Sequence, residues 1–166
     1  MELKDGKARF IESWGKLGSS WGISRTMAQL HALLLITPKA MCADQIMEEL
    51  KISRGNVNMN IRALCDWGLV HKELKPGDRK EYFIAEKDMT RVMKQIIRHR
   101  KQKELDPMIR MLNEISCVES ECPESKEFCQ TIKDLKLYTE KVDKTLERFI
   151  ESDSNWIQSL LFKVLR

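Results

Sequence analysis

Hydrophobic residues recur every three or four positions through most of the chain, which predicts a mainly α-helical protein. Residues 1–21 form the first such segment. Its apolar face consists of Phe10, Trp14, Leu17 and Trp21. The same segment contains three glycines, Gly15, Gly18 and Gly22. Because glycine weakens an isolated helix, we expect this helix to pack closely against another backbone.

Two further helical segments follow. The first is rich in leucine and ends at Thr37-Pro38, because the residue before a proline disfavours the helical conformation. Residues 43–50 make a short helix whose expected N-cap, Cys42, is a residue type that caps poorly. Asp44 in the first turn partly compensates through the helix dipole. Residues 51–53 then form a turn of the length found in helix-turn-helix motifs.

The helix that begins after Ser53, a good N-cap, is distinguished by its polar residues. Its buried face is predicted to consist of Val57, Ile61 and Leu64. Gly68 follows where a left-handed C-cap would lie. The other face carries forked or amide side chains, namely Arg54, Asn56, Asn58, Asn60 and Arg62. Arginine can contact O6 and N7 of guanine together, and asparagine can pair with adenine, so this face is suited to a DNA major groove.

Two short strands are predicted directly after this helix, at Val70–Leu74 and Glu81–Ile84. Pro76-Gly77 between them favours a turn, so the strands should form a β-hairpin. The loop of the hairpin carries three basic residues, Lys75, Arg79 and Lys80. These side chains would reach a phosphate backbone or an adjacent minor groove. Asp78 is expected to orient Arg79.

The charge and composition of the chain limit the class of protein to which it can belong. The net charge is +4 and the pI about 8.8, but the segment from Lys51 to Lys80 holds seven basic residues and three acidic ones. That local excess is compatible with phosphate contacts. Hydrophobic residues make up 42% and charged residues 33%, which excludes a disordered or membrane composition. No apolar run approaches the ~20 residues of a membrane span, and no signal core is present, so we expect a cytoplasmic protein.

No set of side chains in the sequence favours an enzyme or a metal site. The three histidines are scattered, and no nucleophile–base pair or phosphate-binding loop occurs. The five cysteines are Cys42, Cys65, Cys117, Cys122 and Cys129. Their odd number argues against a disulfide framework, and the spacing of the last three matches no zinc signature. We therefore expect neither catalysis nor a metal or other cofactor, and the role of those three cysteines stays open.

Residues 88–166 are predicted to form a helical dimerisation region. Asp88 caps a long helix, and Asp106-Pro107 is expected to break it and begin another. Between residues 125 and 152 the apolar residues follow nearly a heptad spacing. They are Phe128, Ile132, Leu135, Val142, Leu146 and Phe149. A single domain cannot bury this seam, so we expect two copies to pair through it, and the apolar residues of segment 156–164 should contribute to the same contact.

Several motifs together resemble the GbsR-type branch of the MarR family of winged-helix transcriptional regulators. In chain order the motifs are FIESWGKLGSSWGISRTMAQLHALLLITP, SRGNVNMNIRAL, WGLV and PGDRKEYF. The resemblance implies a winged helix-turn-helix domain over residues 1–87 and a homodimeric repressor that binds an inverted-repeat operator. Some members of the branch sense choline or related betaine precursors. Cys42 stands where Ser or Thr is usual, and Ser24 where proline is common.

The resulting prediction is a mainly α protein with a small β-hairpin wing, acting as a sequence-specific transcriptional regulator on double-stranded DNA. Base contacts are assigned to Arg54, Asn56, Asn58 and Arg62. Backbone contacts are assigned to Ser53, Lys75, Arg79 and Lys80. An aromatic cage for a small-molecule effector would use Trp14, Trp21 or Trp67, although core packing is the favoured role of the first two. The alternative is a winged helix that docks a protein partner without specific DNA binding.

Overall fold

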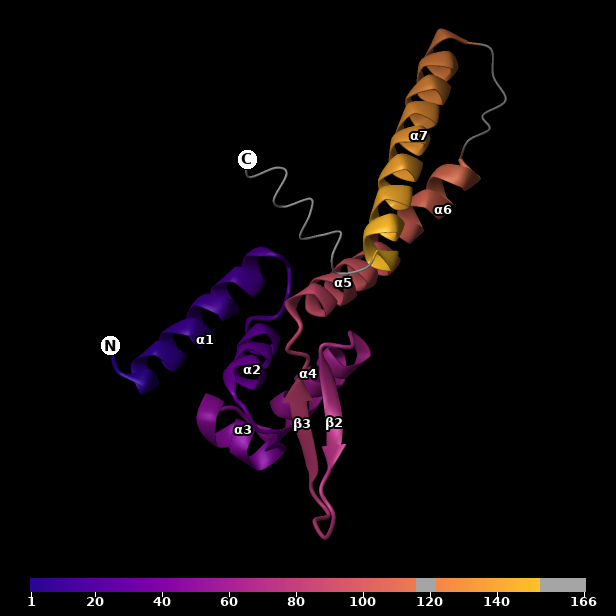
Figure 1. The fold of residues 1–166 in the computed structure, drawn as a ribbon. Coiled ribbons are helices and arrows are strands. Elements are labelled where there is room, and N and C mark those ends of the chain that lie inside the picture. Colours follow the sequence, from indigo (N-terminus) through magenta and orange to yellow (C-terminus); the bar gives the residue numbers. More distant parts are fainter. Residues whose placement is uncertain (116–121, 153–166) are drawn as a thin grey trace, which may run out of the picture. The chain divides into compact units, whose positions relative to one another are not determined.

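The computed structural model describes residues 1–115 and 122–152 and divides the chain into two compact units. Unit 1 comprises residues 1–92, and unit 2 begins at Met93 (Figure 1). The chain passes from one unit to the other within the helix α5 (Met89–Arg100). Cys117 and the apolar segment 156–164 lie outside the described residues.

Unit 1 has the winged-helix fold, with helices packed around a small antiparallel sheet. Its elements before α5 are α1 (Leu3–Ser20), α2 (Arg25–Ile36), β1 (Met41–Cys42), α3 (Ala43–Leu50), α4 (Arg54–Asp66), β2 (Val70–Leu74) and β3 (Glu81–Ala85). The strand order is β1-β3-β2, with Val70 opposite Ala85 and Met41 opposite Phe83. The predicted fold class is thus confirmed, and the predicted hairpin matches to within one residue. The two residues of β1 were not predicted, because so short a strand has no periodicity of its own.

The core of unit 1 forms around α2, which is buried along most of its length. The largest side chains that are less than 2% exposed in this unit are Leu30, Leu34, Ile46, Leu64, Val57, Val70 and, at the unit boundary, Val92. They come from α2, α3, α4, β2 and α5. Their burial fixes α4 and the sheet against the same central helix.

Lys87 closes the C-terminal end of α2. Its ammonium donates hydrogen bonds to the backbone oxygens of Leu34, Leu35 and Thr37, over 2.7, 2.7 and 2.9 Å. The last carbonyls of a helix lack partners within the helix, and the helix dipole favours a cation there. Burial lowers the pKa of Lys87. Lys87, two residues after the end of β3, therefore connects the base of the hairpin to the core.

Two glycines allow α1 to pack closely on α2. A Cβ added at Gly18 would lie 2.5 Å from the Cβ of Ala28, and one added at Gly15 would lie 2.6 Å from the Cγ of Gln29. The predicted close approach is confirmed at these two positions. Gly22 differs, because its φ is +75° and no atom lies within 4 Å of an added Cβ. Its conformational freedom serves the turn between the helices.

His31 lies in the core where α1 meets α2. His31 is only 4% exposed. The Trp14 ring is tilted against its imidazole ring, with 6.4 Å between the ring centres. The Nε2 atom of His31 has no hydrogen-bond partner within residues 1–115 and 122–152. Burial, with a smaller contribution from the charge of Lys87, lowers the pKa of His31 from 6.5 to about 4. The ring is therefore neutral at neutral pH.

Unit 2 is helical in its described part. After α5 come the π-helical segment η1 (Lys101–Leu105), α6 (Asp106–Glu114) and α7 (Pro123–Glu151). The predicted break at Asp106-Pro107 is wrong, because Leu105 and Asp106 both keep helical backbone angles. The Asp106 N–H bonds to the Lys101 carbonyl, five residues back. This wider turn carries the helix up to Pro107, which has no N–H to donate.

The π-helical segment places Lys101 among three carboxylates. Its Nζ lies 3.0 Å from Asp106, 2.8 Å from Asp143 and 3.4 Å from Glu147. The Lys101 side chain is only 14% exposed, and these bonds raise its pKa. The cluster joins η1 and α6 to α7.

Replacing Gly18 with alanine should destabilise unit 1 by about 1–3 kcal/mol, because the added methyl group overlaps Ala28. Thermal unfolding followed by circular dichroism measures this change. Gly6→Ala is the matched control in the same helix, since an added Cβ there meets nothing nearer than 3.7 Å. That control should be neutral or slightly stabilising. An equal loss in both variants would contradict the close packing of α1 on α2.

Acidification should destabilise the protein through His31, whose pKa is about 4 in the folded chain, against an ordinary value of 6.5. The unfolded chain takes up the proton first, so stability falls as the pH drops from about 6.5 towards 4. We expect a loss of about 1–2 kcal/mol between pH 7 and pH 5 in denaturant titrations. His31→Leu should remove most of this loss, whereas His71→Gln, at an exposed position of β2, should retain it. The opposite pattern would show that His31 is not the group responsible.

Candidate nucleic-acid interface

The helix α4 is anchored by an apolar side that faces the core. That side consists of Val57, Ile61 and Leu64, which are 0%, 3% and 1% exposed. At the N-terminus, the Ser53 hydroxyl accepts a hydrogen bond from the Asn56 N–H over 3.3 Å. At the C-terminus, Gly68 has a φ of +70°, the left-handed conformation predicted for it. Both ends and one side of α4 are thus fixed, and its opposite side faces outward.

The outward side of α4 carries Arg54, Asn58 and Arg62, which are all exposed. They recur every fourth residue, so they lie along one side of the helix. Met59 beside them is 64% exposed, which the sequence did not indicate, because methionine in an amphipathic helix is ordinarily assigned to the core. An apolar side chain at this place can contact the methyl group of a thymine.

The two other asparagines of α4 bond to each other. Asn60 is 3% exposed, and its Nδ2 donates to the backbone oxygen and to the Oδ1 of Asn56, each over 2.8 Å. The expectation that Asn60 belongs to the outer polar face is therefore wrong. Asn56 is half-buried, and its side-chain oxygen accepts one hydrogen bond from Asn60. An amide oxygen can accept a second hydrogen bond, so the predicted contact of Asn56 with a base stays a prediction.

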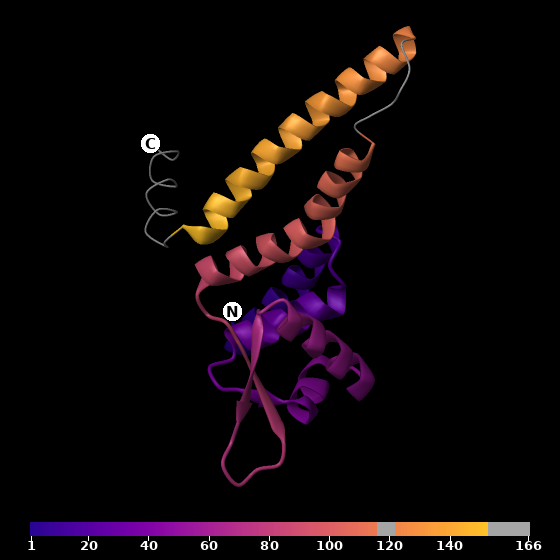
Figure 2. The same cartoon turned by 90° about the vertical axis from the view of Figure 1, so that its right-hand side faces the viewer.

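The β2–β3 hairpin projects beyond α3 and α4 (Figures 1 and 2). The Lys75 ammonium lies 3.7 Å from the centre of the Tyr82 ring, a cation–π contact. Asp78 accepts hydrogen bonds from the Lys80 N–H over 2.9 Å and the Tyr82 hydroxyl over 2.8 Å, and both bonds lower its pKa. Asp78 therefore holds the hairpin together, and the expectation that it orients Arg79 is wrong.

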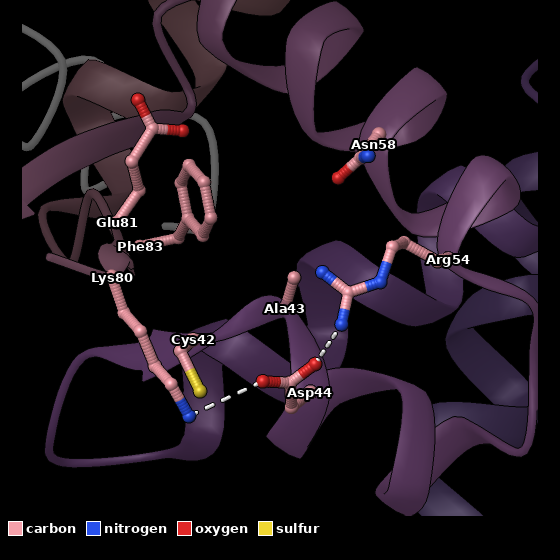
Figure 3. Close-up of a pocket in the computed structure, with 8 residues that line it drawn as sticks. All are labelled: Cys42, Ala43, Asp44, Arg54, Asn58, Lys80, Glu81 and Phe83. Atoms are coloured by element: carbon pink, nitrogen blue, oxygen red, sulfur yellow. Dashed lines mark hydrogen bonds and ion pairs between the residues drawn. The ribbon is translucent and has the colours of Figure 1, made fainter.

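A hollow of about 260 Å³ lies between α4 and the first residues of β3, bordered by the start of α3 (Figure 3). It is lined by Cys42, Ala43, Asp44, Arg54, Asn58, Lys80, Glu81 and Phe83. A second hollow, of about 420 Å³, shares Asn58, Glu81 and Phe83 with the first and adds Arg62 and Lys72. Four residues predicted to contact DNA, namely Arg54, Asn58, Arg62 and Lys80, thus line one continuous surface.

Asp44 lies in the first hollow, between Arg54 and Lys80 (Figure 3). One carboxylate oxygen is paired with the Arg54 guanidinium, and the other lies 3.3 Å from the Lys80 Nζ. Capping of α3 involves Gln45, whose Oε1 accepts a hydrogen bond from the Cys42 N–H over 2.9 Å. The sequence assigned Asp44 to the helix dipole alone. Its ion pairs could not be predicted, because they join residues that only the tertiary fold brings together.

The three tryptophans of the predicted aromatic cage lie on different elements. Trp14 is in α1, where it stacks on Phe10 with 5.3 Å between ring centres and also contacts His31. Trp21 follows α1 and is 46% exposed. Trp67 follows α4 and is half-buried. Trp14 therefore has the packing role that the sequence favoured, whereas the same expectation for Trp21 is wrong, because its side chain is exposed.

The described cysteines carry no disulfide. Cys42 is buried and Cys65 half-buried, Cys122 caps α7 and Cys129 lies within that helix. In residues 1–115 and 122–152, no group of three or more His, Cys, Asp or Glu side chains is arranged to hold a metal ion. Within the same ranges, no helix combines the length and the apolar character needed to cross a membrane.

Two known proteins are similar to this chain. No family model matches the chain. The chain is 31% identical to the HTH-type transcriptional repressor GbsR of Bacillus subtilis (strain 168) over 78 residues, which are 47% of this chain and 43% of the repressor. The match thus spans less than half of that relative. The resemblance inferred from the sequence motifs is confirmed.

The structure also matches a crystal structure of a transcriptional regulator. The TM-score is 0.58 at 22% sequence identity, over 89% of this chain and 99% of the other. At this identity the likeness shows the shared fold. Both similar proteins are described as regulators of transcription.

Proposed function

We propose that this winged-helix chain, which resembles the GbsR-type regulators, binds double-stranded DNA and represses transcription at a specific operator. The main support is the exposed row of Arg54, Asn58 and Arg62 on α4, next to a basic hairpin. In helix-turn-helix proteins the second helix of the motif enters the major groove. Here α3 and α4 form that motif, and the turn between them is made by Lys51 with a φ of +52°.

Base contacts are proposed for the outward side of α4. Arg54 and Arg62 have the geometry to pair with O6 and N7 of guanine, and Asn58 can pair with adenine. Arg62 is exposed and lines the second hollow together with Asn58. It is therefore available to a base. Met59 would contact a thymine methyl on the same side.

Backbone contacts are proposed for the hairpin and for the start of α4. Lys75, Arg79 and Lys80 are exposed on the wing, and Ser53 lies at the helix N-terminus. Side chains and helix N-termini of this kind bind phosphates and fix the register of a protein on DNA, without reading the sequence. The bonds of Asp78 and Tyr82 would hold these cations in place before DNA binds.

A homodimer is proposed to form through α7. Phe128 and Leu135, seven residues apart, are each 42% exposed, whereas Ile132 and Thr139 beside them are 8% and 4% exposed. Ile132 was predicted to lie in the seam between copies, but it is buried within unit 2. The neighbouring side chains of Phe128 and Leu135 leave an apolar strip for a second copy. A two-fold dimer would present two α4 helices to major grooves about 34 Å apart, which suits an inverted-repeat operator. Control by a small-molecule effector would rest on the resemblance alone, because Trp14 is engaged with His31 in the core.

Arg62→Ala should weaken binding to a selected duplex by about 1–3 kcal/mol and relax discrimination at one base position. The duplex can be obtained by selection from a random pool with the purified protein, and competition mobility-shift assays measure the discrimination. Arg79→Ala is the control on the wing. This variant should bind the selected and the random duplexes less tightly by the same factor, and its affinity should depend less on salt. Unchanged discrimination in Arg62→Ala would remove Arg62 from the base-contacting set.

Leu135→Glu should dissociate the dimer, because a charge would be placed in the apolar strip between copies. Sedimentation equilibrium at several protein concentrations measures the change as at least a tenfold weaker association, on the order of 1.4 kcal/mol or more. Leu137→Glu is the matched control. Leu137 is 53% exposed. It lies two residues after Leu135, on nearly the opposite side of the helix. If Leu137→Glu dissociated the dimer and Leu135→Glu did not, the proposed strip would be wrong.

A further inference from the structure

The cations that line the two hollows include three that are paired with acids of the same unit. Arg54 and Lys80 in the first hollow pair with Asp44, and Lys72 in the second pairs with Glu81 over 2.7 Å. The side chains of Arg54, Lys80 and Asp44 are 62%, 59% and 46% exposed. These pairs therefore lie at the surface that the proposed DNA contact would cover. A phosphate that approaches Arg54 or Lys80 meets the Asp44 carboxylate as well.

The position of Asp44 is fixed by its surroundings. It lies in the first turn of α3, immediately after β1. In β1, Cys42 pairs with Tyr82 of β3, and the Cys42 N–H is bound by Gln45. The backbone of Asp44 is thus held where α3, α4 and the hairpin meet, and its short side chain places the carboxylate on the wall of an open hollow of about 260 Å³ (Figure 3). The carboxylate cannot withdraw far when DNA approaches.

We propose that Asp44 is a specificity-determining residue, whose carboxylate competes with DNA phosphates for Arg54 and Lys80 and so weakens binding to arbitrary sequences more than binding to the operator. This inference rests on the proposed DNA-binding function. Binding to arbitrary DNA relies almost wholly on phosphate contacts. A fixed negative charge beside two of the cations therefore opposes this mode of binding most strongly.

The same negative charge lowers the affinity for the operator less. The guanidinium of Arg54 has five N–H donors in a planar fork, so it can keep one edge on Asp44 and turn another to a guanine. An aspartate in a major groove can also accept a hydrogen bond from the N4 amino group of a cytosine. Next to the correct bases, the carboxylate orients Arg54 and finds donors of its own. The Asp44 carboxylate thus lowers the affinity for arbitrary DNA more than the affinity for the operator.

Asp44→Asn tests this inference, because it removes the charge and keeps the shape. Fluorescence anisotropy would be measured with a random-sequence duplex and a selected duplex at low and high salt. We expect affinity for the random duplex to rise about two- to fivefold at low salt, as for the loss of exposed ion pairs, with a steeper salt dependence. Affinity for the selected duplex should change less or fall. The ratio of the two affinities should therefore decrease.

Two controls separate this effect from general electrostatics and from folding. Glu49→Gln removes an exposed acid from another side of α3 and should leave the ratio unchanged. In an Arg54→Met, Lys80→Met background, Asp44→Asn should no longer raise the affinity for the random duplex. An equal change of both affinities, upward or downward, would overturn the inference and leave the proposed function standing. A wild-type protein that binds neither duplex would instead overturn the proposed function.

Discussion

The burial of one side of α4 against α2 is the interaction on which the proposed interface depends. Val57, Ile61 and Leu64 are almost completely buried, and the burial of each such side chain contributes about 1.5–3 kcal/mol. Because the helix repeats every 3.6 residues, this packing also decides which residues point outward. Arg54, Asn58 and Arg62 are exposed as a consequence of the core, and loss of that core would remove the surface as well as the fold.

The surface itself combines three elements. The strand β1 pairs with β3 and leads directly into α3, so β1 links the hairpin to the first helix of the motif. Asp44 then links α3 to α4 through Arg54 and to the hairpin through Lys80. At the hairpin, Tyr82 is bonded to Asp78 and covered by Lys75. The groups that would meet DNA are therefore arranged in the free protein, at the cost of giving several cations an acidic or aromatic partner.

Local signals in the sequence were sufficient for much of this architecture. Ser53 and Gly68 bound α4 because capping depends on a few neighbouring residues, and the alternation around a proline–glycine turn predicted the hairpin. Residues whose role depends on distant partners could not be assigned in this way. Asn60 looks polar in sequence but is buried with Asn56, Lys87 binds carbonyls some fifty residues earlier, and the helix continues through Asp106 because a π-helical turn precedes it. The paired state of Arg54 and Lys80 belongs to the same group.

The most direct test of specific DNA binding is an anisotropy titration of the wild-type protein with selected and random duplexes at two salt concentrations. If α4 and the hairpin contact bases and phosphates together, the selected duplex will bind more tightly, and both affinities will fall steeply as salt increases. A protein without measurable DNA affinity at low salt would contradict this account. The exposed side of α4 would then have to be treated as a docking surface for another protein.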